Sequence, residues 1–307
     1  MDRVNTTTSL IRLLLGLICL FWLQAAPQAR ADGEVKVLII DGFSNHDWRT
    51  TTRRIVGILQ KHGGFATTVS TSPGAGASAA DWDAWRPAIA GQDVVLLNCN
   101  DLGNPVDWPD RVRDALEHFV QDGGGLYVFH SANNAFAQWP EYNRMIGLGW
   151  RDKSFGPACI VNNEGKVERI PAGQGENTSH GDRVDALVTR VGDHPIHRGL
   201  PRQWRAADIE VYTYARGPAE NMEILAYSKD NRYGLGFPTE WVVHYGRGNV
   251  YNATYGHLWT GMDNPPGFRC AGFQTILVRA LFWLANKPVP DSAPEDFPGS
   301  VRPSLRD

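Results

Sequence analysis

The sequence predicts an α/β protein whose central sheet is mainly parallel. Two short runs, Val35 to Ile40 and Asp93 to Cys99, are continuously apolar at their centres, which is typical of strands buried on both faces. Helical patterns lie between the predicted strands of the first half. Strands that alternate with helices at this spacing form right-handed βαβ units, so we expect these strands to run parallel.

The first half of the chain supplies the parallel strands in order. Apolar positions between Thr50 and His62 have helical spacing, and two glycines end that helix. Residues 65–70 are predicted as the second strand and residues 93–99 as the third. The next helix has Pro109 near its first turn and ends at three glycines, after which residues 126–129 form the fourth strand.

The second half of the chain is more mixed. Residues 185–191 and 222–228 are predicted as strands, and residues 240–257 as an antiparallel hairpin that turns at a Gly-Arg-Gly sequence. The apolar stretch from Gly272 to Asn286 predicts a closing helix. Arg151 to Gly181 has little periodicity, so we expect a long loop over the sheet edge.

The two ends of the chain are expected to lie outside the α/β domain of residues 32–290. Basic residues, an apolar run from Leu13 to Leu23 and a small-x-small site ending at Ala31 are typical of a secretory signal peptide over residues 1–31. The run is shorter than the roughly 20 apolar residues of a membrane span. We therefore expect cleavage and export to the periplasm or the medium, without stable membrane insertion; an uncleaved anchor is the alternative. Residues 291–307, rich in Pro, Ser and Asp, are expected to be loosely ordered.

Composition restricts the class of partner. A formal charge of −3 with both signs mixed argues against nucleic acid as a partner. Eleven tryptophans and nine tyrosines suit stacking on a sugar, although ordinary core aromatics are the alternative. Three cysteines follow the signal peptide, an odd number that allows one disulfide without specifying it. The oligomeric state stays open.

Three of the nine histidines follow the ends of predicted strands. His46 follows the first strand, His130 ends the fourth, and His257 ends the hairpin. The carboxyl ends of parallel strands share one edge of a sheet, so these imidazoles can converge at a ligand site. Imidazole suits acid–base catalysis near neutral pH, and three imidazoles also suit zinc. No H-E-x-x-H or H-x-H spacing accompanies them, and His130 can alternatively cap its strand.

Other polar residues near this edge are candidates for binding a hydroxyl-rich ligand. Asp47, Asp208 and Glu210 can orient a histidine, act as a base or hold the ligand; turn residues and solvated side chains are the alternatives for the last two. The candidate substrate-binding residues are Asp47, Trp48, Ser131, Asn133, Asn134, His194 and Tyr212. Ser131 lacks the G-x-S-x-G context of a nucleophile.

An ordered set of short segments relates the chain to a known family. The segments are VLIIDGFSNHDW, GGGLYVFHSANNAF, HPIHRGLP, DIEVYTY and WVVHYGRGNVYNATYGH. In order and approximate spacing the chain resembles the trehalose-utilisation (ThuA-like) family from Val35 to Pro288. The resemblance implies a fold like that of class I glutamine amidotransferases, a flavodoxin-like doubly wound, mainly parallel sheet with helices on both faces and an added antiparallel hairpin. It also implies that His130 stands where amidotransferases keep a nucleophilic cysteine.

The resemblance extends to individual residues and to substrate class. His46 and Asp47 match the family's HDW segment, while His194, Glu210 and His257 match its HP, acidic-aromatic and GH segments. Members are associated with disaccharide catabolism beside oxidoreductases that make 3-keto sugars. The chain departs from the commonest cytosolic members in its export signal and its glycine-rich insertion near Gly156 to Gly181.

These observations together predict an exported carbohydrate-active enzyme. Its substrate is expected to be a small 3-keto sugar or glycoside that undergoes isomerisation, elimination or hydrolysis. His130 is the expected base, His46 or His257 its acid partner or a metal ligand, and Glu210 an orienting carboxylate. A metal-assisted version places Zn²⁺ on His46, His130 and His257. A non-catalytic sugar-binding protein is the alternative.

Overall fold

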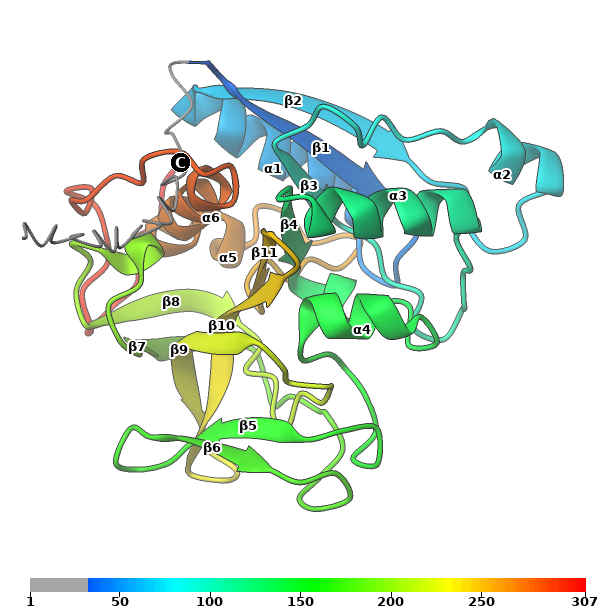
Figure 1. Ribbon diagram of the computed structural model, residues 1–307. Coiled ribbons are helices and arrows are strands. Elements are labelled where there is room, and N and C mark those ends of the chain that lie inside the picture. The colour runs from blue at the N-terminus through cyan, green and yellow to red at the C-terminus, as the bar shows by residue number, and fades with distance from the viewer. Residues whose placement is uncertain (1–32) are drawn as a thin grey trace, which may run out of the picture.

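The computed structural model describes residues 33–307, which form an α/β fold around one large sheet (Figure 1). The predicted signal peptide, residues 1–31, lies outside the described residues. The strand order is β2-β1-β3-β4-β11-β10-β9-β7-β8, and a β5–β6 hairpin joins the sheet through β10. The strands are β1 (Val35–Asp41), β2 (Phe65–Thr71), β3 (Val94–Leu97), β4 (Gly125–Phe129), β5 (Ala158–Val161), β6 (Val167–Ile170), β7 (Val184–Arg190), β8 (Gln203–Ile209), β9 (Met222–Asp230), β10 (Leu235–Tyr245) and β11 (Gly248–Ala253).

One half of the sheet is parallel, as the sequence predicts. Strands β2, β1, β3, β4 and β11 run in the same direction, with Val37 of β1 opposite Thr67 of β2 and Val94 of β3. Alternate residues of β1 pack into different apolar clusters on the two faces of the sheet: Val37 and Ile39 belong to one, Leu38 and Ile40 to the other. Because both faces are buried, the strand reads as a continuous apolar run.

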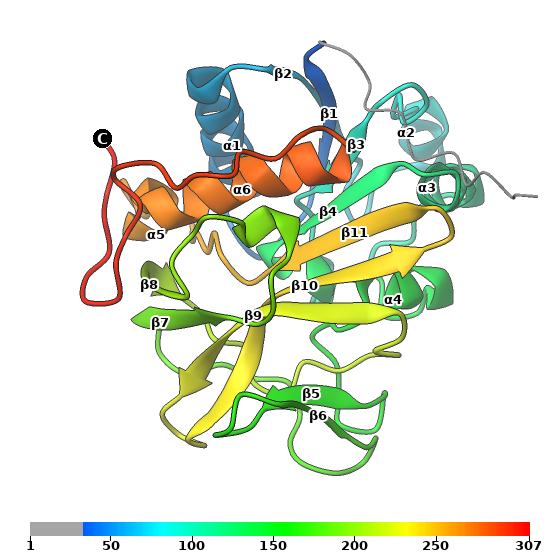
Figure 2. The same ribbon diagram turned by 60° about the vertical axis from the view of Figure 1, so that its left-hand side comes forward.

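Helices cover both faces of this half (Figure 2). On one face lie α1 (Trp48–His62), α5 (Pro266–Arg269) and α6 (Ala271–Leu284). On the other lie α2 (Ala79–Ala84), α3 (Asp110–Gln121) and α4 (Pro140–Ile146). Helix α6 is apolar and buried almost all round, which is typical of a helix in the core of a larger protein. The doubly wound arrangement confirms the predicted fold class.

The other half of the sheet is antiparallel and larger than the sequence indicates. The predicted hairpin is present as β10 and β11, but β11 also pairs with β4 in parallel and thereby joins the two halves. Strands β9, β7 and β8 continue the sheet antiparallel beyond β10. The expectation of a long structureless loop from Arg151 to Gly181 is wrong, because this stretch contains β5 and β6, of which β5 pairs with β10 at Gly236.

Residues 291–307, for which we expected loose order, lie against the helices that follow β11. The main-chain N–H of Ala271 donates to Ser304 O, and that of Arg306 donates to Arg269 O. Phe297 packs against the core near Trp204. Cys99, Cys159 and Cys270 are buried and free. Within residues 33–307 no helix combines the length and the apolar character needed to span a membrane.

Candidate functional site

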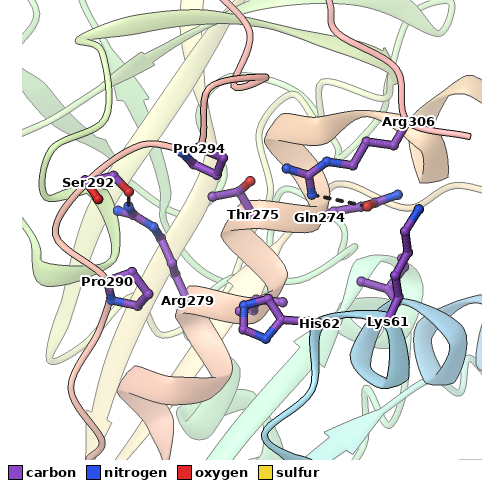
Figure 3. A pocket seen from close by; sticks show the side chains of 11 residues that line it. Lys61, His62, Gln274, Thr275, Arg279, Pro290, Ser292, Pro294 and Arg306 are labelled. Atoms are coloured by element: carbon purple, nitrogen blue, oxygen red, sulfur yellow. Dashed lines mark hydrogen bonds between the residues drawn. The ribbon is translucent and has the colours of Figure 1, made fainter.

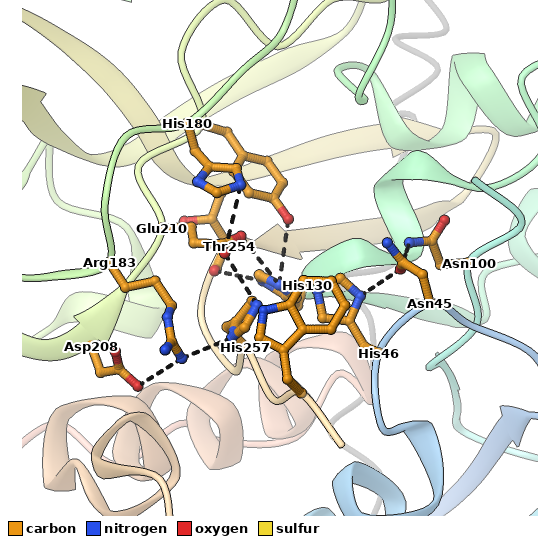
Figure 4. A network of polar contacts seen from close by, with 12 residues as sticks. Asn45, His46, Asn100, His130, His180, Arg183, Asp208, Glu210, Thr254 and His257 are labelled. Carbon is orange, nitrogen blue, oxygen red and sulfur yellow. Dashed lines mark hydrogen bonds and ion pairs between the residues drawn. The ribbon is translucent and has the colours of Figure 1, made fainter. Parts of the chain in front are cut away.

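Three histidines from distant parts of the chain meet beyond the carboxyl ends of the parallel strands (Figure 4). His46 lies in the loop after β1, His130 directly follows β4, and His257 lies in the loop after β11. One ring nitrogen from each lies within 4.8 Å of those of the other two. The strand order brings them together, because β4 is the neighbour of β11 and only β3 separates it from β1. We refer to these residues with Glu210 as the histidine centre.

His130 occupies a strained turn. Its φ of 44° lies in the left-handed region that non-glycine residues rarely adopt. The residue joins β4 to a short 3-10 helix, η1 (His130–Asn134). Its Nδ1 donates to the main-chain oxygen of Thr254 at 2.8 Å. Since Nδ1 carries the proton, the neutral ring presents the lone pair of Nε2 to Tyr212 Oη at 3.4 Å and to Glu210 Oε2 at 3.7 Å.

His46 has the same tautomer, set by a different acceptor. Its Nδ1 donates to Asn45 Oδ1 at 2.7 Å, and the same oxygen accepts a second bond from Asn100 Nδ2. The Nε2 of His46 is buried and has no hydrogen-bond partner among the described residues. The indole of Trp259 stacks on the ring at 4.4 Å between centroids, and this tryptophan is 42% exposed. Trp259 therefore forms the solvent-facing cover of His46.

His257 has the opposite tautomer. Arg183 Nη1 can only donate, so Nδ1 of His257 accepts its bond at 3.1 Å. The neutral ring then carries its proton on Nε2, which faces Glu210 Oε1 at 3.2 Å. Gly256 makes this placement possible: its φ is 96°, and a Cβ there would lie 2.1 Å from Phe129 Cζ. Any other residue at 256 would push the loop away from β4.

Glu210 reaches the centre from the antiparallel half of the sheet. It follows β8, its residue is 4% exposed, and its carboxylate faces His130, His257 and, at 3.7 Å, His180 Nε2. Burial raises the pKa of this carboxyl, and the nearby His180 and Arg183 partly oppose the effect. Burial therefore favours the protonated form of this carboxyl relative to a free glutamate, which suits a proton donor beside neutral imidazoles.

Burial lowers the pKa of the imidazoles, whereas it raises that of Glu210. It lowers the pKa of His46 to about 4 and that of His257 to about 3, and it lowers the pKa of His130 well below its usual value. The neighbouring rings add to the effect by mutual repulsion. All three rings are therefore neutral at pH 7; His46 and His130 present Nε2 lone pairs, whereas the lone pair of His257 accepts from Arg183. This weakens the assignment of His46 or His257 as the acid and makes Glu210 the better proton donor.

The same arrangement fits a divalent transition metal. The Nε2 lone pairs of His46 and His130 face the centre while their Nδ1–H groups are held by oxygen atoms, the arrangement usual for metal-ligating histidines. His257 is the third member of the group whose ligand nitrogens lie within 4.8 Å of one another, which gives a three-histidine donor set of the kind known for zinc. His257 would join through Nε2 only by releasing Arg183. Zinc–nitrogen bonds of about 2.0–2.1 Å would draw the rings closer together.

The remaining sequence candidates fall into two groups. Tyr212 contacts His130 of the centre. Ser131, Asn133 and Asn134 lie in η1 directly after His130. Both asparagines have buried amide atoms without hydrogen-bond partners among the described residues. Asp47 caps α1 by accepting from Thr50 N at 3.0 Å, and Trp48 is the first residue of that helix. His194 is not brought to the centre.

His194 caps a different turn. Its Nδ1 accepts from Ile196 N at 3.3 Å at the start of η2 (Pro195–His197), and its ring packs against Trp283 of α6. Burial lowers its pKa to about 4. The expectation that His194 binds substrate is therefore not supported by its position: the HP pair forms a helix cap with Pro at its first position.

Sequence reasoning missed three residues of the site. His180 and Arg183 lie in the stretch before β7, and Trp259 follows His257 by two positions. His180 and Arg183 do not follow the end of a parallel strand, so the argument that identified the other histidines does not include them; Trp259 follows β11, but it is not a histidine. The TYGHLW sequence is a usable signal for Trp259, since a ring two residues beyond a site histidine lies close to it.

Two hollows differ in their relation to the centre. One of about 540 Å³ is lined by the loop after β3, by Asn134 of η1 and by Trp150, whose ring contacts that of Tyr212; no residue of the histidine centre lines it. Another, of about 300 Å³, lies between α1, α6 and the C-terminal tail, where Lys61, Arg279 and Arg306 line it (Figure 3). No residue of the histidine centre lines this second hollow.

Comparisons with known proteins agree on the family. A family model described as trehalose utilisation (ThuA) matches residues 36–284. A solved ThuA-like protein of Parabacteroides merdae is 29% identical, covers 89% of this chain and 98% of its own, and has a TM-score of 0.81. A ThuA-like protein of Bacteroides uniformis is 17% identical, covers 87% and 98%, and has a TM-score of 0.53. No curated protein matches the chain.

Proposed function

Because the chain belongs to the trehalose utilisation (ThuA) family, we propose that its histidine centre acts on carbohydrate, with a keto sugar or keto glycoside as substrate. The observation that carries this proposal is the convergence of three neutral imidazoles, two of which, His130 and His257, face the buried carboxyl of Glu210. Proton transfer next to a carbonyl needs a base and an acid of matched pKa held within reach of each other. The family description supports a sugar as the substrate class.

The chemistry that suits these groups is proton abstraction beside a sugar carbonyl. A keto group acidifies the neighbouring C–H, and the Nε2 lone pair of His130 takes that proton. In elimination, the electron pair of the C–H bond forms a C=C bond while the glycosidic C–O bond breaks, and Glu210 protonates the departing oxygen. In isomerisation the proton returns to a neighbouring carbon instead. Tyr212 and His257 hold the catalytic pair in place.

A divalent metal, held by His46, His130 and His257, is part of the proposal. When bound, it would polarise the substrate carbonyl as a Lewis acid. The chain's own contribution is to fix the two tautomers through Asn45 and Thr254. His130 and His257 then act as ligands, and Glu210 is the group left to move the proton.

Elemental analysis tests the metal. Protein purified without chelator is compared with His130→Ala and with His118→Ala, which removes an exposed histidine of α3. We expect near-stoichiometric transition metal in the parent and in His118→Ala, and its loss in His130→Ala. A metal-free parent protein, or metal retained by His130→Ala, would remove the metal from the proposal and leave His130 as the base.

Turnover distinguishes an enzyme from a binding protein. A 3-keto methyl glycoside is supplied to the parent, to His130→Ala and to the His118→Ala control. We expect a loss of at least about 100-fold in kcat for His130→Ala, since a positioned base contributes roughly 10²–10⁴-fold. Binding without turnover by the parent protein, weakened a few-fold by the substitution, would identify a non-catalytic sugar-binding protein instead.

Export is the second part of the proposal. It is supported by the basic start, the apolar run from Leu13 to Leu23 and the small-residue site at Ala29 to Ala31. The mature chain would then begin at Asp32 and meet its substrate outside the cytoplasm. N-terminal sequencing of protein from the periplasmic and cytoplasmic fractions tests this, and full-length protein in the cytoplasm would contradict it.

A further inference from the structure

One nitrogen of Arg183 is shared among three acceptors beside the histidine centre (Figure 4). Its Nη1 lies 3.1 Å from His257 Nδ1, 3.4 Å from Asp208 Oδ2 and 3.3 Å from Met262 Sδ. A guanidinium Nη atom carries two hydrogens, so it cannot serve all three acceptors at once. Arg183 can therefore give up His257 and keep the other two.

The bond from Arg183 holds His257 in a form that cannot bind a metal. Because Nδ1 accepts, the neutral ring carries its proton on Nε2, and a protonated nitrogen has no lone pair to offer. In His46 and His130 the reverse holds, since their Nδ1–H groups donate to oxygen atoms and leave Nε2 free. His257 is thus the member of the three-histidine donor set whose lone pair is turned away.

This tautomer leaves a buried donor unsatisfied. Nε2 of His257 makes no hydrogen bond to any described residue, although Glu210 Oε1 lies 3.2 Å away. A buried N–H without a partner costs free energy. Moving the proton to Nδ1 would free Nε2 for a cation, but it would set an N–H group against the Arg183 donor. The bond to Arg183 and a metal bond at Nε2 therefore exclude each other.

The surroundings of Arg183 allow it to release His257. Its side chain is 30% exposed and lies directly before β7, in a connecting segment. The carboxylate of Asp208 is its ion-pair partner, and this pair does not depend on the imidazole. Release consequently costs one shared hydrogen bond, while the charge of the guanidinium stays paired.

We propose that Arg183 is a positioning residue that controls metal binding at the histidine centre: it holds His257 in the tautomer that cannot bind, and it moves onto Asp208 when a divalent cation takes the Nε2 lone pair. The inference rests on the metal part of the proposed function. The apparent metal affinity is then reduced by the fraction of molecules in which His257 is released, so the centre binds more weakly than its three imidazoles would without Arg183.

Competition for Zn²⁺ with a fluorescent chelator tests this on the metal-free parent protein, Arg183→Met and Arg232→Met. Methionine is of similar length but has no donor. Arg232 is the matched control for the loss of a positive charge, because its bonds go to Asp230 and to the main-chain oxygen of His180 instead of an imidazole ring. We expect the Kd for Zn²⁺ to fall at least tenfold in Arg183→Met and to stay within threefold of the parent in Arg232→Met.

Asp208→Asn tests where Arg183 goes. Asparagine suits this position, because the φ of Asp208 is 50° and asparagine tolerates the left-handed region. Loss of the carboxylate makes release harder, so the Kd for Zn²⁺ should rise at least threefold. In Arg183→Met the same substitution should change the Kd less than twofold. Equal effects in the two backgrounds would mean that Asp208 acts on the cation by charge alone and would overturn this part of the proposal.

The tautomer of His257 is a readout that a change of charge alone does not move. In metal-free protein labelled with ¹⁵N-histidine, the ring signals that disappear in His257→Gln are those of His257. We expect the proton on Nε2 in the parent and in Arg232→Met, and on Nδ1 in Arg183→Met. A proton already on Nδ1 in the metal-free parent would overturn the proposal.

The outcomes separate this inference from the proposed function. Zn²⁺ binding by the parent with no gain in Arg183→Met, or with an equal gain in Arg232→Met, overturns the role of Arg183 and leaves the metal standing. Binding by Arg183→Met but not by the parent supports the role of Arg183 and removes the metal from the proposed function. Absence of Zn²⁺ binding in both proteins overturns both.

Discussion

The main-chain oxygen of Thr254 accepts a 2.8 Å hydrogen bond from Nδ1 of His130. This bond crosses between the ends of two neighbouring parallel strands, β4 and β11, and it decides which nitrogen of His130 faces the site. A main-chain acceptor cannot be removed by substitution at Thr254, so the tautomer is a property of the sheet. The chemistry at His130 therefore depends on the pairing of β11 with β4.

Glu210→Gln tests the carboxyl as the proton carrier. We expect kcat on a 3-keto glycoside to fall at least about 100-fold, because an amide cannot exchange the proton. The free energy of unfolding should be unchanged or higher at pH 7, since burial already disfavours the charged form of this group. Glu223→Gln, at an exposed position of β9, is the control. Activity within threefold of the parent would exclude Glu210 from proton transfer.

Gly256→Ala tests the close approach that places His257. The new Cβ would meet the Phe129 ring at 2.1 Å in a backbone conformation that disfavours side chains, so we expect a loss of about 2–5 kcal/mol in the free energy of unfolding. Gly261→Ala has a similar φ, 86°, but no atom within 4 Å of its Cβ, and should cost about 1 kcal/mol. Urea denaturation measures both. Equal losses would mean that the contact with Phe129 is easily relieved.

His194→Asn tests the pH dependence of stability at the buried cap. The pKa of His194 is about 4 in the folded protein against 6.5 in the unfolded chain, so the unfolded chain binds more protons between these values. Stability therefore falls as pH falls from 6.5 to 4. Asparagine keeps a capping acceptor and cannot titrate, so the slope should decrease by up to about 1.4 kcal/mol per pH unit.

Urea unfolding at a series of pH values from 4.5 to 7.5 measures this slope. His118→Asn controls for the loss of a histidine at an exposed position. An unaltered slope in His194→Asn would mean that the ring is already protonated in the fold.

Trp259→Ala tests the exposed ring over His46. The stacking at 4.4 Å places a flat apolar face at the solvent side of the centre, where an incoming sugar ring would meet it. We expect KM for a keto glycoside to rise several-fold, equivalent to about 1 kcal/mol, with little change in kcat. Tyr233→Ala removes a ring of similar exposure, 37% against 42%, from a different region. A loss confined to kcat would instead assign Trp259 to holding His46.

The sequence predicts the parallel half of the fold and the meeting of three histidines for the same physical reason. Strands buried on both faces are continuously apolar, and the residues at their carboxyl ends share an edge, so His46, His130 and His257 could be placed together without any knowledge of loops. Glu210 was a candidate as a carboxylate near this edge and also through the family resemblance; it follows β8 and faces His130 and His257.

The features that the sequence did not predict also share a physical reason. Strand β6 is largely exposed and has no apolar pattern, while β5 is apolar and buried but only four residues long, so its run is too short to stand out. His180 and Arg183 reach the centre from connecting segments whose path depends on the whole antiparallel half. His194 carries a family motif, yet its role as a helix cap is visible only once Trp283 and α6 are in place.

The position of β11 in the sheet has a consequence for how the protein acquires activity during synthesis. His257 and the Thr254 oxygen follow β11, the last strand to leave the ribosome, yet this strand inserts between β4 and β10, both made earlier. A nascent chain that has folded β1 to β4 therefore holds His130 without the Thr254 oxygen that orients it. Such long-range pairing is slow to form. Catalytic competence should consequently appear as one of the final events of folding, and a chain truncated after Tyr245 should keep much secondary structure while remaining inactive.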